Sequence, residues 1–163
     1  MRKYTFPMVV DDFIPHKEPT LLLDTVEEVT PSRVVCKLNV GSRNAVAYTE
    51  DQELPVIALL EVMAQALSVW NSFYGNRGNR KNRFGILVNV SRLIVTRNSS
   101  LPKGMELRVS ANLESNERGY VRFLCDVKDV LENEIIANAK LTGLVPNDTQ
   151  IHDFVHQTEL NAL

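Results

Sequence analysis

One carboxylate stands in the most apolar part of the sequence. Glu61 lies within the segment Leu54–Trp70, LPVIALLEVMAQALSVW, whose other residues are nearly all apolar. On a helix of 3.6 residues per turn it forms a polar stripe with residues that follow at spacings of four, three and four, namely Gln65, Ser68 and Ser72. A carboxyl group held in a poorly hydrated cleft has a raised pKa and carries a proton at neutral pH. That property suits a general acid.

The stripe has a second interpretation, in which it is only the solvent-facing edge of a core helix. The rest of the helix surface is apolar and suited to a core: Val56, Leu59, Leu60, Met63, Ala66, Leu67, Val69, Trp70 and Phe73. A helix that is apolar on nearly all sides is stable in water only if other elements surround most of it. The sequence leaves the two interpretations of the stripe open.

Strand patterns lie on both sides of this helix. Two precede it and four follow: Thr20–Thr30, Arg33–Val40, Phe84–Val95, Met105–Ser115, Tyr120–Val130 and Glu134–Val145. Most of the links between successive strands are short and rich in turn residues, which is typical of antiparallel connections. This order predicts an α+β fold in which an antiparallel sheet wraps around one long central helix, the hot-dog fold.

Length and composition indicate one globular domain. The 163 residues are 44% hydrophobic and 23% charged, and we expect a core over about 13–145 and a C-terminal tail, 146–163, that could form a helix. The net charge of −2 gives no overall attraction to nucleic acid or anionic lipid. The N-terminus has no long apolar run, so we expect neither a secretory signal nor a membrane span. Cys36 and Cys125 are expected to be buried free thiols in a reducing cytoplasm.

Three segments resemble the FabA/FabZ-type 3-hydroxyacyl-acyl-carrier-protein dehydratases. LLEVMAQALSVW resembles their central-helix signature, in which a carboxylate precedes a Met-Ala-Gln-Ala run. IPHKEPTLLLDTVEEV (14–29) resembles their N-terminal Pro-His segment, and FGILVNVSRLIVTRNSSLPKGMELRVSANL resembles the strand pair after the helix, with its Pro-x-Gly turn. The resemblance covers about 13–145. Within the family, PHKEPTLLLD and LPVIALLEVMAQA are most similar to the aryl-polyene (ApeP-like) dehydratase branch.

The resemblance implies a dehydratase that converts a carrier-bound 3-hydroxyacyl thioester to the 2-enoyl thioester in fatty-acid or polyene biosynthesis. Glu61 is then the acid. His16, in the Pro-His segment, is the candidate base because histidine titrates near neutrality. His16 could instead only pin the N-terminal segment through hydrogen bonds. FabZ enzymes carry their catalytic histidine in a Gly-His-Phe-Pro-Gly loop before the helix, and the corresponding Arg43–Pro55 contains none.

Two other functions therefore stay open. The chain could be a hot-dog thioesterase in which Glu61 activates water or attacks the thioester. It could also be a non-catalytic partner, or a subunit that supplies half a site to a related chain. We expect a homodimer by default, or a heterodimer with a related hot-dog subunit, because pairing of sheet edges covers an exposed strand.

Further binding residues are expected around the helix. The helix is expected to start near Pro55, at its first position, and the free backbone N–H groups that follow are suited to polarise a thioester carbonyl. Pro55, Val56, Ile57 and Gln65 are expected to bind substrate. A basic loop follows the helix and contains Arg77, Arg80, Lys81 and Arg83. It could be merely a solvated loop, but it would also attract an acidic acyl carrier protein.

No metal, cofactor or nucleic acid is expected. His152 and His156 have the i, i+4 spacing of a metal pair and could bind a metal if a carboxylate joined them. They fit better in a tail helix that rests its apolar residues, Ile151, Phe154 and Val155, on the domain. The basic loop has no interleaved aromatic residues for stacking on bases.

Overall fold

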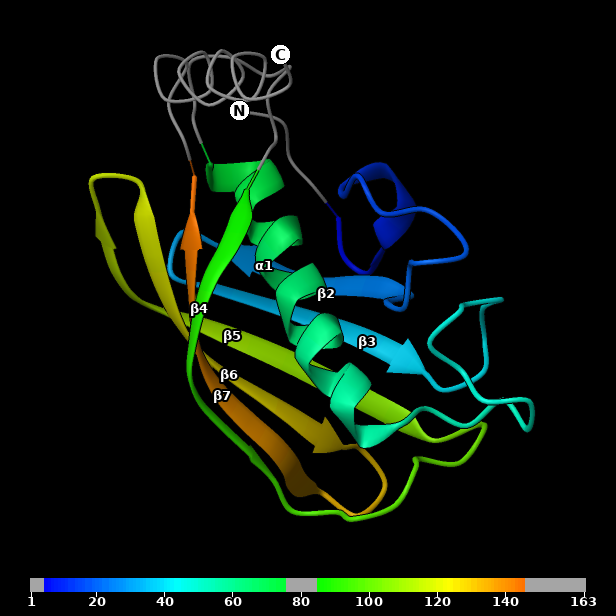
Figure 1. The fold of residues 1–163 in the computed structure, drawn as a ribbon. Helices are drawn as coiled ribbons and strands as arrows, with labels where there is room; N and C mark the ends of the chain where they lie inside the picture. Colours follow the sequence, from blue (N-terminus) through cyan, green and yellow to red (C-terminus); the bar gives the residue numbers. More distant parts are fainter. Residues whose placement is uncertain (1–4, 76–84, 146–163) are drawn as a thin grey trace, which may run out of the picture.

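A computed structural model describes residues 5–75 and 85–145. In this part of the chain one α-helix, α1 (Leu59–Tyr74), lies against a seven-stranded sheet. The strands are β1 (Met8–Val9), β2 (Thr25–Thr30), β3 (Arg33–Asn39), β4 (Ile86–Val95), β5 (Glu106–Glu117), β6 (Tyr120–Asp129) and β7 (Glu134–Leu144). Their order is β1-β2-β3-β5-β6-β7-β4, and every neighbouring pair is antiparallel. Figure 1 shows the sheet curving around α1, which confirms the predicted hot-dog fold.

Alternating apolar residues place one face of the sheet against α1. In β6 the buried apolar positions are Val121, Phe123, Cys125 and Val127, with less buried residues between them. Successive side chains of a strand point to opposite faces, so this set faces the helix. The turn from β5 to β6 has positive φ at Arg118 (53°) and Gly119 (86°). Such a turn matches the twist of the strands that it joins.

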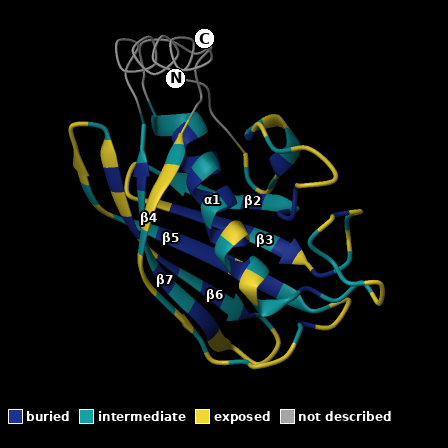
Figure 2. Ribbon diagram, in the orientation of Figure 1, coloured by how far each residue is buried: buried dark blue, intermediate teal, exposed yellow. Residues whose placement is uncertain are grey.

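The helix forms the centre of the core. A 3-10 turn, Val56–Ala58, follows Pro55 and leads into α1. Trp70 packs edge-on against Phe123, with ring centroids 5.0 Å apart, and its Nε1 donates to Pro31 O at 3.0 Å. Length and composition alone would let Val56–Tyr74 span a membrane. Here the segment packs inside the sheet as a core helix, and Figure 2 shows buried residues along it.

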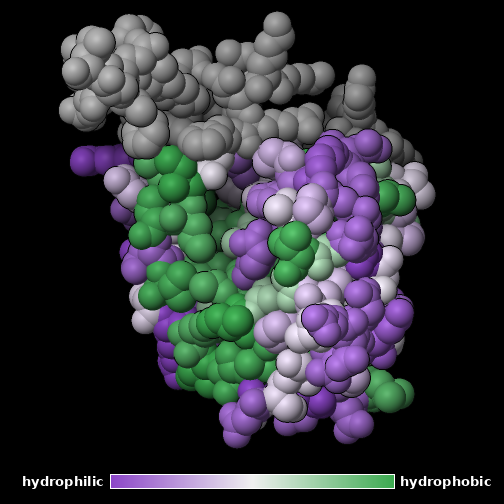
Figure 3. All heavy atoms as spheres, turned by 45° about the vertical axis from the view of Figure 1, so that its right-hand side comes forward, coloured by the Kyte–Doolittle hydropathy of each residue, from purple (hydrophilic) through white to green (hydrophobic). Residues whose placement is uncertain are grey.

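Strand β4 forms one edge of the sheet. Among the described strands it pairs with β7 alone, and its register shifts between Leu87 and Asn89 and again between Val90 and Arg92. Shifts of this kind are bulges, which turn side chains away from strict alternation. Leu87, Val88 and Ile94 are exposed although they are apolar. Figure 3 shows an apolar band down the side of the molecule where β4 lies.

The predicted boundaries need two corrections. The predicted strand Thr20–Thr30 begins at Thr25 as β2, because Leu22 and Leu23 before it donate their backbone N–H groups to Gln65 of α1. Pro55 precedes a 3-10 turn, so it is not the first residue of the α-helix. Strand β1 and a 3-10 turn at Val10–Asp12 were not predicted.

Some predictions lie outside the described residues. They concern the tail 146–163 with its two histidines, His152 and His156, and the basic loop with Arg77, Arg80, Lys81 and Arg83.

Candidate active site

The segment before His16 is fixed on the last turns of α1. Phe13 stacks on Phe73 with ring centroids 5.0 Å apart, and Ser72 Oγ donates to Phe13 O. Ile14 is buried in the core. This segment covers part of the polar stripe of the helix, and His16 follows directly.

The segment after His16 is held by Gln65. The Gln65 side chain is fully buried, and its Oε1 accepts from Leu22 N at 3.0 Å and from Leu23 N at 3.4 Å. Its Nε2 donates to Thr20 O at 2.8 Å. An amide group offers two acceptor sites and two donor hydrogens, so one donor remains. That donor is given to Glu61.

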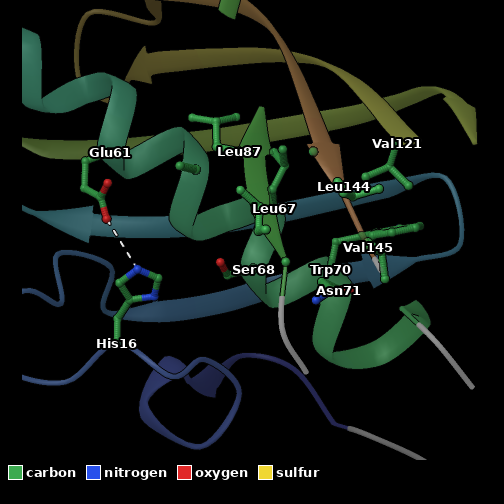
Figure 4. Close-up of a pocket in the computed structure, with 14 residues that line it drawn as sticks. His16, Glu61, Leu67, Ser68, Trp70, Asn71, Leu87, Val121, Leu144 and Val145 are labelled. Carbon is green, nitrogen blue, oxygen red and sulfur yellow. Dashed lines mark ion pairs between the residues drawn. The ribbon is translucent and has the colours of Figure 1, made fainter. Parts of the chain in front are cut away.

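His16 and Glu61 lie side by side. His16 Nε2 is 3.5 Å from Glu61 Oε1, and Gln65 Nε2 donates to the same oxygen at 2.9 Å. Figure 4 shows the imidazole and the carboxylate directed toward each other from different elements. Their separation exceeds a normal N–H···O hydrogen bond, so the two groups are adjacent without being locked together. His16 Nδ1 is buried and has no hydrogen-bond partner among the described residues.

The pair stands at one end of a pocket of about 200 Å³. The pocket runs between α1 and the strands β4, β6 and β7. Its apolar wall is formed by Ala64, Leu67, Trp70, Ile86, Leu87, Val121, Leu144 and Val145. Two glycines, Gly85 and Gly143, leave room in it, and Ser68 and Asn71 add polar groups. The arrangement offers an apolar channel that starts at an acid–base pair.

An ion cluster occupies the region before the helix in which FabZ enzymes carry their histidine. Arg43 donates through its two terminal nitrogens to Asp11, at 2.7 and 3.2 Å, and through Nε to Asp24 Oδ1 at 3.2 Å. Asp24 also accepts from Ser42 Oγ and Asn39 N. The hydrogen bond from Arg43 lowers the pKa of the Asp11 carboxyl. The cluster fastens this region to the N-terminal segment that carries His16.

Comparison with known proteins decides the family. Residues 8–155 match the ApeP-like family, described as ApeP dehydratase. The chain belongs to the ApeP-like dehydratases. A curated relative, the 3-hydroxyacyl-[acyl-carrier-protein] dehydratase FabZ of Rickettsia rickettsii (strain Sheila Smith), is 23% identical over 151 residues. The alignment covers 87% of this chain and 100% of that protein.

Solved structures confirm the fold of the ApeP-like chain. The dehydratase heterocomplex ApeI:P from Xenorhabdus doucetiae matches with a TM-score of 0.75 and 23% identity, over 91% of this chain and 97% of that chain. Zebra fish thioesterase superfamily member 2 matches with a TM-score of 0.57 and 16% identity, over 75% of this chain and 80% of that chain. Likeness at this identity shows a common fold.

The structure brings together the two predicted catalytic residues of the ApeP-like chain. The solvent-edge interpretation of the helix stripe is wrong at Gln65, which is fully buried beneath the N-terminal segment. The expected burial of Glu61 is wrong for the single chain. Its side chain is 48% exposed, since the described elements leave this end of the pocket open.

The predicted binding residues are placed differently. The amide of Gln65 is committed to four protein hydrogen bonds and has no group left for substrate. Pro55, Val56 and Ile57 precede Glu61 and are not part of the pocket wall. Asn71 lines the pocket but was not predicted as a site residue. It follows Ser68 by three residues and so continues the polar stripe of the ApeP-like helix.

Proposed function

We propose that this ApeP-like chain dehydrates a carrier-bound 3-hydroxyacyl thioester to the 2-enoyl thioester, in fatty-acid or polyene biosynthesis, with His16 as base and Glu61 as acid. The observation that carries the proposal is the 3.5 Å separation of His16 Nε2 and Glu61 Oε1 at the end of an apolar pocket. Dehydration removes a proton and a hydroxyl group from adjacent carbons. An acid and a base that lie side by side are therefore suited to it.

The elimination follows from this geometry. His16 Nε2 takes the proton from C2, the released electron pair forms the C2=C3 bond, and the C3–O bond breaks. Glu61 gives its proton to the departing oxygen, which leaves as water. Nε2 is assigned this role because it faces Glu61, whereas Nδ1 is buried. The reaction leaves an imidazolium beside a carboxylate, and transfer of one proton between them restores the starting state.

Gln65 acts as a positioning residue. It donates to Glu61 Oε1 and leaves Oε2 to carry the proton. Its other three hydrogen bonds go to the backbone of the segment that follows His16. One buried amide thus fixes both members of the pair relative to each other.

The thioester carbonyl needs hydrogen-bond donors of its own. We assign this role to the backbone N–H groups of Val56 and Ile57, at the start of the helical segment. They precede Glu61 by about one turn, and the positive end of the helix dipole lies there.

A second hot-dog chain completes the site in this proposal. Glu61 and His16 are 48% and 30% exposed in one chain, so water reaches both. The apolar edge of β4 lies beside them, because Ile86 and Leu87 belong to the pocket wall. A partner strand along β4 would cover this edge and exclude water. The partner is a second copy or a related hot-dog subunit, as in the ApeI:P heterocomplex.

The substrate is delivered by an acyl carrier protein in this proposal. The FabZ relative is named for an acyl-carrier-protein substrate, and Arg77, Arg80, Lys81 and Arg83 stay a prediction for the docking of an acidic carrier. We place the protein in the cytoplasm, because its two cysteines are free thiols, as in a reducing compartment.

One assay separates the candidate activities. Purified chain is mixed with a 3-hydroxyacyl carrier protein, and the enoyl product and free thiol are followed together. Enoyl product supports dehydration. Release of thiol without it supports a thioesterase. If neither forms, the assay is repeated with a related hot-dog subunit present, and activity only then identifies a half-site subunit.

Variants test the two assigned roles. Glu61→Gln and His16→Gln should each lower kcat at least about 100-fold, which is the usual contribution of a general acid or base. Glu114→Gln is the matched control, because Glu114 pairs with Lys140 and Arg122 away from the pocket. Turnover by both site variants at the rate of this control would remove them from the mechanism.

A further inference from the structure

Asn71 is a buried polar side chain in the pocket wall. The residue is 8% exposed, and its Oδ1 is buried and accepts no hydrogen bond within residues 5–75 and 85–145. Leaving such a group unpaired costs about 1–3 kcal/mol, and most buried amides in proteins avoid that cost. The described part of the chain therefore contains no hydrogen-bond partner that accounts for the polarity of Asn71 Oδ1.

The Asn71 amide fits closely between two glycines, with Oδ1 toward Gly75 and Nδ2 toward Gly85. A Cβ added at Gly75 would lie 1.8 Å from Asn71 Oδ1, and one added at Gly85 would lie 3.2 Å from Nδ2. Both neighbours are thus glycines, and Gly85 itself belongs to the pocket wall. Rotation of the amide by 180° exchanges its two ends, so the side chain can present an acceptor or a donor.

Asn71 and the catalytic pair are separated along one helix. Asn71 follows Glu61 by ten residues on α1, which corresponds to about 15 Å at a rise of 1.5 Å per residue. Figure 4 shows Asn71 on the far side of Leu67 and Ser68 from Glu61. The wall between them is mainly apolar, with side chains such as Leu67, Leu87 and Leu144.

We infer that Asn71 selects acyl chains that carry a hydroxyl group about 15 Å from the reacting carbons, by a hydrogen bond at the far end of the pocket. The inference rests on the proposed function, because it takes the reacting carbons to lie at His16 and Glu61. A hydroxyl group both donates and accepts, so it pairs with either end of the amide. A charged group would lose its hydration in an apolar pocket without gaining a counter-charge.

The test uses pairs of 3-hydroxyacyl thioesters of increasing length, one member of each pair ending in a methyl group and the other in a hydroxyl group. The native protein should prefer the hydroxyl form by about tenfold to a hundredfold in kcat/KM, the range expected when a buried amide gains its missing partner. The preference should peak at the chain length that reaches Asn71 and fall for shorter and longer chains. A ratio that does not change with length overturns the inference.

Asn71→Leu keeps a side chain of similar size and removes both hydrogen-bonding ends. It should reduce the preference at the peak length to about one. The matched control, Asn112→Leu, changes the same residue type on β5 outside the pocket and should retain the preference. Asn71→Ser serves as a second variant if the leucine prevents folding. A preference that survives at Asn71→Leu or Asn71→Ser shows that another group selects the chain.

A binding measurement separates this inference from the proposed function. Free fatty acids and their ω-hydroxy counterparts are compared by the rise in thermal midpoint that each produces in the native protein and in Asn71→Leu. A larger rise with the ω-hydroxy acid, lost in the variant, supports the role of Asn71 even if no thioester is turned over. Equal rises for the two acids contradict it even if the protein proves to be a dehydratase.

Discussion

Gln65 Nε2 donates a hydrogen bond to Glu61 Oε1 at 2.9 Å, from one turn further along the same helix. The same amide bonds to the backbone at Thr20, Leu22 and Leu23. The acid of the proposed dehydratase and the chain segment that follows its base therefore share a single anchor. Two variants of Gln65 can therefore separate its effect on the stability of the fold from its effect on catalysis.

Gln65→Met should both destabilise the fold and slow turnover. The backbone N–H groups of Leu22 and Leu23 would lose their acceptor in a dry environment, so the free energy of unfolding should fall by about 2–4 kcal/mol. Loss of alignment between His16 and Glu61 should lower kcat about 100-fold and change KM little. Urea unfolding and steady-state kinetics measure the two effects.

Gln65→Glu is the informative partner variant. It keeps an acceptor for Leu22 and Leu23 but removes the donor to Glu61 and places a second carboxyl group beside it. The pH–rate profile should therefore shift, whereas the profile of the control Glu114→Gln should not, because Glu114 pairs with Lys140 and Arg122 away from the pocket. A profile identical to that of native protein would mean that Gln65 has only a structural role.

The ion cluster at Arg43 predicts how stability depends on pH. The pKa of Asp11 lies below its ordinary value of 3.8, chiefly because Arg43 hydrogen-bonds the carboxylate. A carboxyl group with a depressed folded-state pKa contributes stability above the unfolded-state value. This contribution is lost as the pH falls from 3.8 through the lower folded-state value. Asp11→Asn should therefore destabilise the protein at neutral pH and have no such effect at strongly acid pH.

The size of this effect is limited by exposure. The Asp11 side chain is 41% exposed, so solvent screening should hold the loss at neutral pH to less than about 1 kcal/mol. Urea unfolding of native protein, Asp11→Asn and the neighbouring control Asp12→Asn at both pH values measures it. A destabilisation of the same size at the two pH values would contradict the linkage.

The two cysteines should be unreactive while the protein is folded. Burial raises the pKa of the Cys125 thiol to about 12 and also raises that of Cys36. The reactive species is the thiolate, and thiols with such raised pKa values form little thiolate at mildly alkaline pH. Mass spectrometry after alkylation should show no label on the native protein and two labels in guanidinium. Rapid labelling of either cysteine in native protein would show that the core opens locally.

The sequence predicted the fold well because its signals are local. Alternation of apolar and polar residues set β5, β6 and β7 to within two residues. The apolar run around Leu59 and Trp70 could be stable in water only if a sheet surrounded it. Strand β1 was missed because two residues carry no periodicity. Leu21–Leu23 reads as strand, but its partner is the helix side chain Gln65, which no pattern within the strand reveals.

The site was predicted only in part, because its contacts join distant segments. The contact of His16 with Glu61 joins residues 45 apart in sequence, and the family resemblance pointed to it where spacing could not. Gln65 was expected to bind substrate, since its type gives no indication that four protein groups would satisfy its amide. Glu61 is exposed because β4 is an edge strand that leaves this side of the pocket open. The order of strands in the sheet, and so the position of its edge, is not contained in the local sequence around Glu61.

The exposed edge of β4 gives the prediction with the widest consequence for the site. If a second hot-dog chain pairs along this edge, the chain alone at micromolar concentration should have the mass of a dimer by light scattering. Val88→Lys should shift it toward monomer, because a charge on the paired edge opposes strand addition. Leu131→Lys is the matched control, since Leu131 is 90% exposed at the turn between β6 and β7.

Dehydration should fall together with assembly. Loss of the partner strand would leave His16 and Glu61 open to water, so Val88→Lys should lose activity in proportion to the dimer lost. If the partner is a related hot-dog subunit, titration with that subunit tests the heterodimer. Val88→Lys should then fail to bind the related subunit. A monomeric Val88→Lys that retains full dehydratase activity would show that one chain suffices and that the half-open site is the working form.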